Sequence, residues 1–201
     1  MAENIQTTPF TILVDDREKG GTNMQHDRMF DFRLYSVPVR RAHLAQGDYS
    51  LLGYEGRFAI ERKSPTDLVS TLFGFHRAGG RKVPNVERFA LELQRLAGYD
   101  HVYVSVTGSE QDVAKAANDH ALEVWSRTGG RYKYPPNPDA VFNLVAALSA
   151  EFAIPFIMFP DVATAERQAL RDFRAWHRKA LGLSHVGGMA GNARKGAQDG
   201  F

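Results

Sequence analysis

Short apolar runs alternate with charged or glycine-containing segments over the first third of the chain. Residues 10–14 form a largely β-branched apolar run, and each of the residues 15–18 that follow carries a charge. Such a run predicts a buried strand with charged residues at its carboxyl end. The same kind of pattern predicts a loop with room for a short helix over 19–36, and further strands over 37–45, 48–53 and 57–63.

Helical spacing is the main signal in the rest of the chain. Ser64 followed by Pro65 predicts a helix that occupies residues 67–73, because a serine hydroxyl is a good N-cap and proline suits the first helical turn. Phe89, Leu93 and Leu96 recur at helical spacing, which predicts an amphipathic helix. That helix spans 86–97; further predicted elements are a strand over 101–106, a weakly helical segment over 109–124, a loop over 129–136, a helix over 139–152, a strand over 155–159 and a helix over 163–181.

Strands and helices alternate after residue 57, and this alternation predicts an α/β fold with a central mixed β-sheet flanked by helices. The 201 residues suit one domain with a proper core, which we place at residues 10–181. Residues 1–9 are then an amino-terminal extension. Residues 182–201 contain six glycines and no apolar period, and they predict a flexible glycine-rich tail.

Composition excludes several classes of site. The chain has no cysteine, which excludes disulfides, thiolate-bound zinc and a catalytic thiol. Its seven histidines are scattered without a paired metal-ligand spacing. No apolar run approaches the roughly 20 residues that cross a bilayer, and the amino terminus lacks the apolar region of a signal peptide. We therefore expect a cytoplasmic protein with no membrane partner.

Positive charge is concentrated in one stretch of a nearly neutral chain. The net charge is +2, but residues 57–95 carry 8 basic and 4 acidic side chains, after a net −2 over residues 1–56. This distribution is typical of a polyanion-binding surface beside a carboxylate site, although scattered solvated charges produce it too. The candidate DNA-binding residues surround a basic loop at 79–82 and a basic-aromatic loop at 131–134; they are Arg77, Arg81, Lys82, Arg88, Arg131 and Lys133. The alternative is that both loops are ordinary solvated surface.

A hairpin predicted between residues 48 and 63 brings opposite charges together. If Tyr54 and Glu55 form a two-residue turn, Asp48 lies directly opposite Glu61. Strand alternation then places Lys63 on the face of Glu61 and Arg62 on the other face. Facing carboxylates repel unless a proton or cation lies between them, and all-oxygen ligands favour Mg²⁺ or Mn²⁺. With Lys63 orienting a water, this arrangement suits phosphodiester hydrolysis; the alternative is a surface hairpin with a cross-strand salt bridge.

Three further acidic residues bear on this site. Asp15 and Glu18 end the neighbouring predicted strand, where their carboxylates would reach the same edge of the sheet. Asp67 lies four residues after Lys63, in the first turn of the next helix. There it is either a charge that caps the helix or an organiser of the basic residues of the site.

Three blocks of the sequence resemble the XPF-type structure-specific nuclease domain of the PD-(D/E)XK superfamily. They are the strand end at 14–18, which fits V-D-x-R-E, the Gly-Asp at 47–48, and the segment 61–67, which fits E-R-K-x-x-x-D. The blocks occur intact and in order, and the similarity extends over about residues 10–180. The later segments look like the compact versions of this domain from phage and prophage genomes.

The resemblance implies a restriction-endonuclease-like core and a metal-dependent endonuclease that acts on branched, flapped or junction DNA. It implies Mg²⁺, with Mn²⁺ as a substitute, and a homodimer in a bacterial or phage-infected cell, although no helix-hairpin-helix module is evident. The alternative is a non-catalytic DNA-binding module of the same fold that acts with a replication or recombination partner. By the motif, the metal ligands are Asp48 and Glu61, and the water-orienting residue is Lys63. The resemblance also implies that Arg62 and Asp67 support the site, and that Asp15 and Glu18 contribute to it or to a second metal. The motif's arginine is Arg17.

Overall fold

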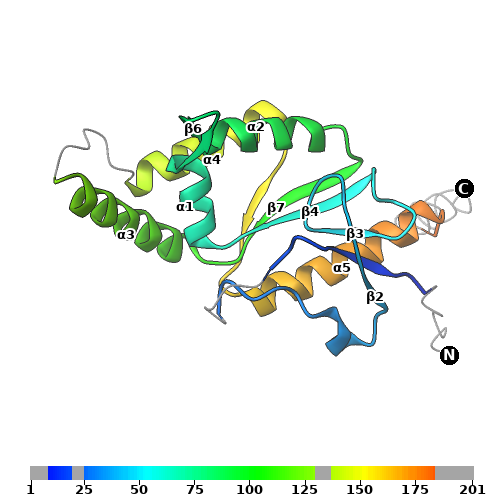
Figure 1. The fold of residues 1–201 in the computed structure, drawn as a ribbon. Coiled ribbons are helices and arrows are strands. Elements are labelled where there is room, and N and C mark those ends of the chain that lie inside the picture. The colour runs from blue at the N-terminus through cyan, green and yellow to red at the C-terminus, as the bar shows by residue number, and fades with distance from the viewer. Residues whose placement is uncertain (1–8, 20–24, 130–136, 184–201) are drawn as a thin grey trace, which may run out of the picture.

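A computed structural model describes residues 9–19, 25–129 and 137–183 of the chain (Figure 1). Within this part, a six-stranded mixed sheet forms the centre of the fold, with the strand order β2-β1-β3-β4-β7-β8. Strand β3 runs antiparallel to its neighbours β1 and β4, and the other neighbouring pairs are parallel. The strands are β1 (Ile12–Asp15), β2 (Val39–Ala42), β3 (Tyr49–Leu51), β4 (Phe58–Lys63), β7 (His101–Val106) and β8 (Phe156–Met158).

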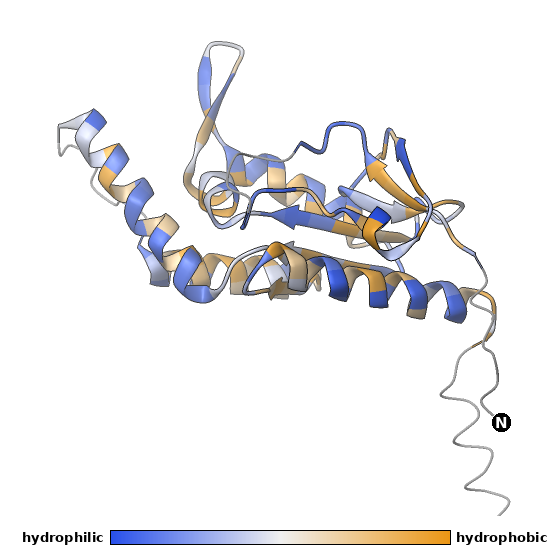
Figure 2. Ribbon diagram, turned by 90° about the horizontal axis from the view of Figure 1, so that it is seen from below, coloured by the Kyte–Doolittle hydropathy of each residue, from blue (hydrophilic) through white to orange (hydrophobic). Residues whose placement is uncertain are grey.

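Helices cover both faces of this sheet, as the two ribbon views show (Figures 1 and 2). On one face lie α1 (Pro65–Phe73), α2 (Asn85–Leu96), α3 (Glu110–Thr128) and α4 (Pro138–Phe152); on the other lies α5 (Val162–Ala180). A 3₁₀-helix at Phe32–Tyr35 packs on the α5 side through Phe32. Each face of the sheet therefore has its own apolar core, and the predicted α/β fold with a mixed sheet between helices is confirmed.

The alternation of β4 decides which side chains reach which core. Phe58 and Ile60 pack into the core beneath α5, whereas Ala59 packs into the core beneath α1 to α4. Because side chains alternate along a strand, Glu61 and Lys63 face the α2 side and Arg62 faces the α5 side. The two faces predicted from the sequence are therefore present.

Local sequence signals explain where the helices begin and end. Ser64 caps α1 by accepting a hydrogen bond from the Asp67 N–H at 3.2 Å, with Pro65 in the first turn as predicted. Ser109 and Asp112 form a capping box at the start of α3. The helix ends at Thr128, four residues beyond the predicted end of the weakly helical segment, and Gly129 caps it with a φ of 60°. Good caps at both ends offset the weak periodicity inside α3.

Two predicted connections are wrong. Residues 52–57 form two successive turns instead of a two-residue turn at Tyr54 and Glu55, with hydrogen bonds from the Tyr54 N–H to the Leu51 carbonyl and from the Arg57 N–H to the Tyr54 carbonyl. The strands nevertheless keep the predicted register at Tyr49, which pairs with Ile60. The predicted direct pairing of Asp48 with Glu61 is wrong, because the Asp48 N–H bonds to the Ile60 carbonyl instead. The predicted basic loop at 79–82 is the end of a second, two-stranded sheet, β5 (Phe75–Ala78) and β6 (Arg81–Pro84).

Some predicted segments lie outside the described residues. They are the extension at 1–8, the loop that holds Arg131 and Lys133, and the tail from residue 184. No helix in the described part of the chain is long and apolar enough to cross a membrane.

Candidate active site

Two adjoining hollows open where β3 and β4 meet α1 and α2, each of about 340 Å³. Asp48, Lys63 and Arg88 border both of them. The first hollow is also lined by Glu61, Glu92 and Asp15, and the second by Glu18, Arg62 and Asp67. The strand ends and two helices thus bring the acidic and basic residues of the sequence motif to one place.

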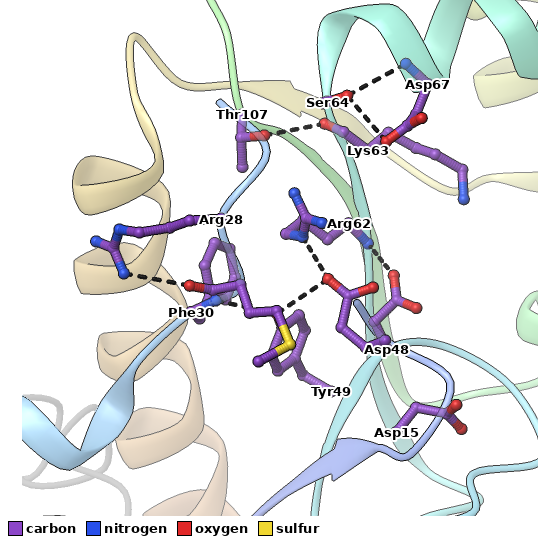
Figure 3. Close-up of polar contacts among 12 residues, drawn as sticks. Asp15, Arg28, Phe30, Asp48, Tyr49, Arg62, Lys63, Ser64, Asp67 and Thr107 are labelled. Atoms are coloured by element: carbon purple, nitrogen blue, oxygen red, sulfur yellow. Dashed lines mark hydrogen bonds and ion pairs between the residues drawn. The ribbon is translucent and has the colours of Figure 1, made fainter. Parts of the chain in front are cut away.

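Asp48 is placed by an irregularity at the residue that precedes β3. Its backbone N–H donates to the carbonyl of Ile60 at 2.9 Å, although Ile60 already pairs with the next residue, Tyr49. Two residues of one strand therefore face one residue of the other, as in a β-bulge. The Asp48 carboxylate turns toward β4 and accepts the backbone N–H of Arg62 at 2.7 Å (Figure 3). The bulge aims this carboxylate at the hollows.

Glu61 and Lys63 form a hydrogen-bonded ion pair on the α2 side of β4. The Lys63 ammonium also lies 5.3 Å from the centre of the Phe89 ring of α2. Burial lowers the pKa of Lys63, but the carboxylates of Glu61 and Asp48 outweigh it and raise the pKa above its ordinary value. Lys63 is therefore a fixed ammonium group at neutral pH.

Glu92 of α2 joins the same group and was missed in the sequence. Burial, followed by the charge of Glu61, raises the pKa of the Glu92 carboxyl from its ordinary value of 4.5 to about 7. The helical spacing did contain a signal, because Glu92 lies three residues after Phe89 and four before Leu96, within the buried stripe of α2. A carboxylate inside an apolar stripe needs a partner, and here its surroundings are Glu61 and Lys63.

Several carboxyl groups lie close together around Lys63. Burial and the charge of Glu61 raise the pKa of Asp48 well above its ordinary value, against the opposing effect of Lys63. Asp48, Glu61 and Glu92 border one hollow, together with Asp15. Carboxylate oxygens are hard donors, and a group of them fits a hard divalent cation such as Mg²⁺ or Mn²⁺.

Asp15 lies at the edge of the first hollow, buried, with both carboxylate oxygens occupied. One oxygen accepts the backbone N–H and the Nε–H of Arg17, and the other accepts Arg17 Nη2 and the backbone N–H of Leu44, all between 2.7 and 3.0 Å. These bonds outweigh the effect of burial and lower the pKa of Asp15. Asp15 and the motif's Arg17 therefore fasten the end of β1 to the segment after β2.

One further acidic group includes Asp15. Among the described residues, potential ligand atoms of Asp15, Asp16 and His43 lie within 4.8 Å of one another. Asp16 and His43 are exposed, with the His43 Nδ1 atom 3.3 Å from the Asp16 carboxylate. Because the Asp15 oxygens already hold four N–H groups, this set is less free to bind a cation than the carboxylates around Asp48.

Glu18 and Arg62 form a largely buried ion pair at the wall of the second hollow. Arg62 Nε donates to Glu18 Oε1 at 2.6 Å, and the Tyr49 hydroxyl reaches the same oxygen at 3.3 Å (Figure 3). Arg62 Nη1 also donates to the carbonyl of His26 at 3.4 Å. The arginine of the E-R-K segment thus ties β4 to the segment after β1, while its neighbours Glu61 and Lys63 face the other way.

Asp67 borders the second hollow, but its hydrogen bonds are made at the amino terminus of α1. Its carboxylate accepts the hydroxyl of Ser64 at 2.9 Å, and its N–H donates back to that hydroxyl (Figure 3). This is the first of the two roles considered from the sequence, a charge near the amino terminus of a helix. Asp67 is exposed, so its carboxylate also adds negative charge to the rim of the hollow.

The predicted DNA-binding residues fall into three places. Arg88 of α2 borders both hollows, and Arg95 of the same helix, which was not predicted, borders the first. Arg77, Arg81 and Lys82 are exposed on the β5–β6 hairpin. Arg131 and Lys133 lie outside the described residues.

Comparisons with known proteins bear on the family and the fold of the chain. The family model of the ERCC4 domain matches residues 14–169. XPF from Aeropyrum pernix has a similar fold, with a TM-score of 0.50 and 19% identity over 85% of this chain. The same protein in a complex with DNA has a TM-score of 0.52 and 17% identity over 85% of this chain. The chain spans 65% and 66% of the length of these two structures. No curated protein matches the chain.

The family match includes every described residue of the acidic site: the carboxyl end of β1, the bulge at Asp48, the Glu61-Arg62-Lys63 segment and Glu92. The solved structures independently show the same mixed sheet between helices. The resemblance to the XPF-type nuclease domain is thereby confirmed. The chain belongs to the ERCC4 domain family.

Proposed function

We propose that this protein is a metal-dependent DNA endonuclease that hydrolyses phosphodiester bonds, with branched, flapped or junction DNA as its substrate. The observation that carries the proposal is the crowding of Asp48, Glu61 and Glu92 around the ammonium group of Lys63. Membership of the ERCC4 domain family supports it. The similar fold of an XPF that has been solved with DNA supports the choice of substrate class.

Asp48 and Glu61 are the proposed ligands of a divalent cation, Mg²⁺ or Mn²⁺, and Glu92 adds a third carboxylate that faces the same hollow. A cation held there would neutralise charge on a phosphate oxygen and make a nearby water more acidic. Asp15 and Glu18, which hold Arg17 and Arg62, keep the strand ends in position. In this scheme they support the site from outside the ligand set.

Lys63 acts as a hydrogen-bond donor. Because its pKa is raised, it keeps its proton at neutral pH and is unsuited to removing one from water. Its ammonium orients the attacking water and stabilises negative charge that develops on the phosphate. Arg88, at the border of both hollows, offers a second positive group to the phosphate backbone.

The test is a cleavage assay with flap, fork, four-way-junction and linear DNA in Mg²⁺ or Mn²⁺. We expect wild-type cleavage that EDTA abolishes, and a loss of at least 100-fold in Asp48→Asn and Lys63→Ala while DNA binding persists. The exposed Asp119 on α3 provides a matched acidic control, and Asp119→Asn should cut as the wild type does. Binding without cleavage of any substrate by the wild type would show a non-catalytic DNA-binding module instead.

A further inference from the structure

The β5–β6 hairpin projects from the body of the protein as a narrow two-stranded arm, at the top of Figure 2. Its strands pair from Phe75 with Pro84 at the root to Ala78 with Arg81 at the end. Gly79 and Gly80 form the two-residue turn, with φ of 56° and 80°. Positive φ at both turn positions is the geometry of a tight hairpin turn and suits glycine. The arm is therefore a defined hairpin rather than an irregular loop.

The arm concentrates positive charge. Arg77 pairs directly with Lys82, so two cationic side chains share one face of the ladder, and the next pair adds Arg81 on the other face. No residue from 75 to 84 is acidic. Within the described residues, none of the three cations forms a salt bridge. Because like charges directly opposite each other destabilise a strand pair, this arrangement favours a bound polyanion.

The root of the arm is firmly attached. Asn85 bonds three ways: its side chain donates to the Ser70 carbonyl at 3.0 Å and contacts His76 Nδ1 at 2.9 Å, and its backbone N–H donates to the Gly74 carbonyl at 2.9 Å. A Cβ at Gly74 would collide with the Ser70 carbonyl oxygen, so the chain passes α1 closer than any other residue allows. An isolated two-stranded hairpin is marginally stable in water, and these contacts hold this one in place.

The arm leads directly to the candidate active site. Ser70 and Asn85, which fasten its root, line the same hollow as Asp48, Lys63 and Arg88. A nucleic-acid strand that lies in this hollow would therefore have the arm beside it. Positive groups then continue from Lys63 through Arg88 to the hairpin.

The chemistry of the arm distinguishes between backbone and base contacts. Proteins that hold unpaired bases present aromatic side chains for stacking. The end of this arm carries glycine and alanine, and its exposed aromatic residue, Phe75, lies at the root with the Lys82 ammonium 5.9 Å from its ring centre. Arginine and lysine side chains on an arm whose end carries no aromatic residue are suited to phosphate oxygens.

We infer that the β5–β6 hairpin is a clamp for the phosphate backbone of duplex DNA next to the cleavage site. This inference rests on the proposed nuclease function for its substrate. The clamp binds without reading base sequence and without metal. It holds a duplex arm of the DNA while the strand to be cut reaches Asp48 and Lys63.

The test measures binding to a blunt 30-base-pair duplex by fluorescence anisotropy in EDTA, at several salt concentrations. Arg77→Ala/Lys82→Ala should bind at least 10-fold more weakly, and the slope of log affinity against log salt should fall by about 2 in magnitude, because two phosphate contacts are lost. Arg174→Ala/Lys179→Ala removes the same charges from exposed positions of α5, on the far side of the sheet, and should bind as the wild type does. Arg77→Glu/Lys82→Glu should bind more weakly still.

Two results would overturn the clamp: equal affinity and salt slope in the arm and control variants, or a loss confined to single-stranded DNA of the same length. Circular dichroism of each variant verifies folding, since the substituted side chains are exposed. Because EDTA prevents cleavage, the outcome is separate from that of the proposed function. A wild type that cuts while its arm variants bind normally refutes the clamp alone, and an arm that binds duplex in a protein that never cuts refutes the nuclease alone.

Discussion

The raised pKa of Glu92 predicts that the acidic site lowers the stability of the metal-free protein as pH increases. A carboxyl that ionises at pH 4.5 in the unfolded chain but near pH 7 in the folded one favours unfolding once the pH exceeds 4.5. Stability should therefore decrease from about pH 5 to pH 7 and level off above. The substitution Glu92→Gln keeps the shape of the side chain and removes this ionisation.

The size of the effect follows from the two pKa values. The difference between 4.5 and about 7, at 1.36 kcal/mol for each pH unit, corresponds to about 3.4 kcal/mol. Glu92 is partly exposed, and solvent screening reduces this to about 1–2 kcal/mol. In a chain of this length, each kcal/mol changes the melting temperature by about 2–4 °C, so Glu92→Gln should melt about 2–8 °C higher than the wild type at pH 8.

The assay is thermal unfolding in EDTA at pH 5, 6, 7 and 8, with Glu87→Gln on the exposed side of α2 as the control. The wild type and the control should lose stability over this range, and Glu92→Gln should lose less. Adding Mg²⁺ at pH 8 should raise the melting temperature of the wild type more than that of Glu92→Gln, because the ion relieves the repulsion. Parallel pH profiles for the wild type and Glu92→Gln would refute the placement of this carboxyl beside Glu61.

Three other changes have defined outcomes. Arg62→Ala leaves Glu18 buried without its partner and should cost about 3–5 kcal/mol in urea unfolding; a cost below 1 kcal/mol would contradict the buried ion pair. Gly74→Ala forces the hairpin root away from Ser70 and should cost about 1–3 kcal/mol, whereas Gly56→Ala, where a Cβ meets nothing within 4 Å, should change little; equal costs would argue against the tight root. Asp48→Asn should lose the rise in melting temperature that Mg²⁺ gives the wild type, and an undiminished rise would place the ion elsewhere.

Much of the fold follows from local pattern. The strand β7 lies where the apolar run 101–106 predicts it, and α1 begins at the serine and proline that signal a helix start. The hairpin β5–β6 was missed because its charged residues give a weak strand signal. Only the adjacent glycines Gly79 and Gly80 mark the turn. Trp125 is 59% exposed on α3, and a helical pattern does not show which end of a long helix extends past the core.

The candidate site was predictable where its residues are adjacent in sequence. Glu61, Arg62 and Lys63 follow strand alternation, and their two faces are those expected. Glu92 lies 31 positions after Glu61 on another element, and only tertiary packing brings the two together. The bonding of Asp15 to Arg17 and Leu44 was equally hidden, because a sequence does not show which carboxylates have their oxygens already occupied.

The division of β4 between two faces also has an evolutionary consequence. Residues 61 and 63 face the hollow, and residue 62 between them pairs with Glu18 on the other face. Under the proposed function, one nucleotide change at a codon for Glu61 or Lys63 would remove the chemistry and leave the scaffold and the arm in place. Descendants that bind DNA without cutting it would then be a single substitution away, whereas a change at residue 62 would lower the stability of the fold on which both faces depend.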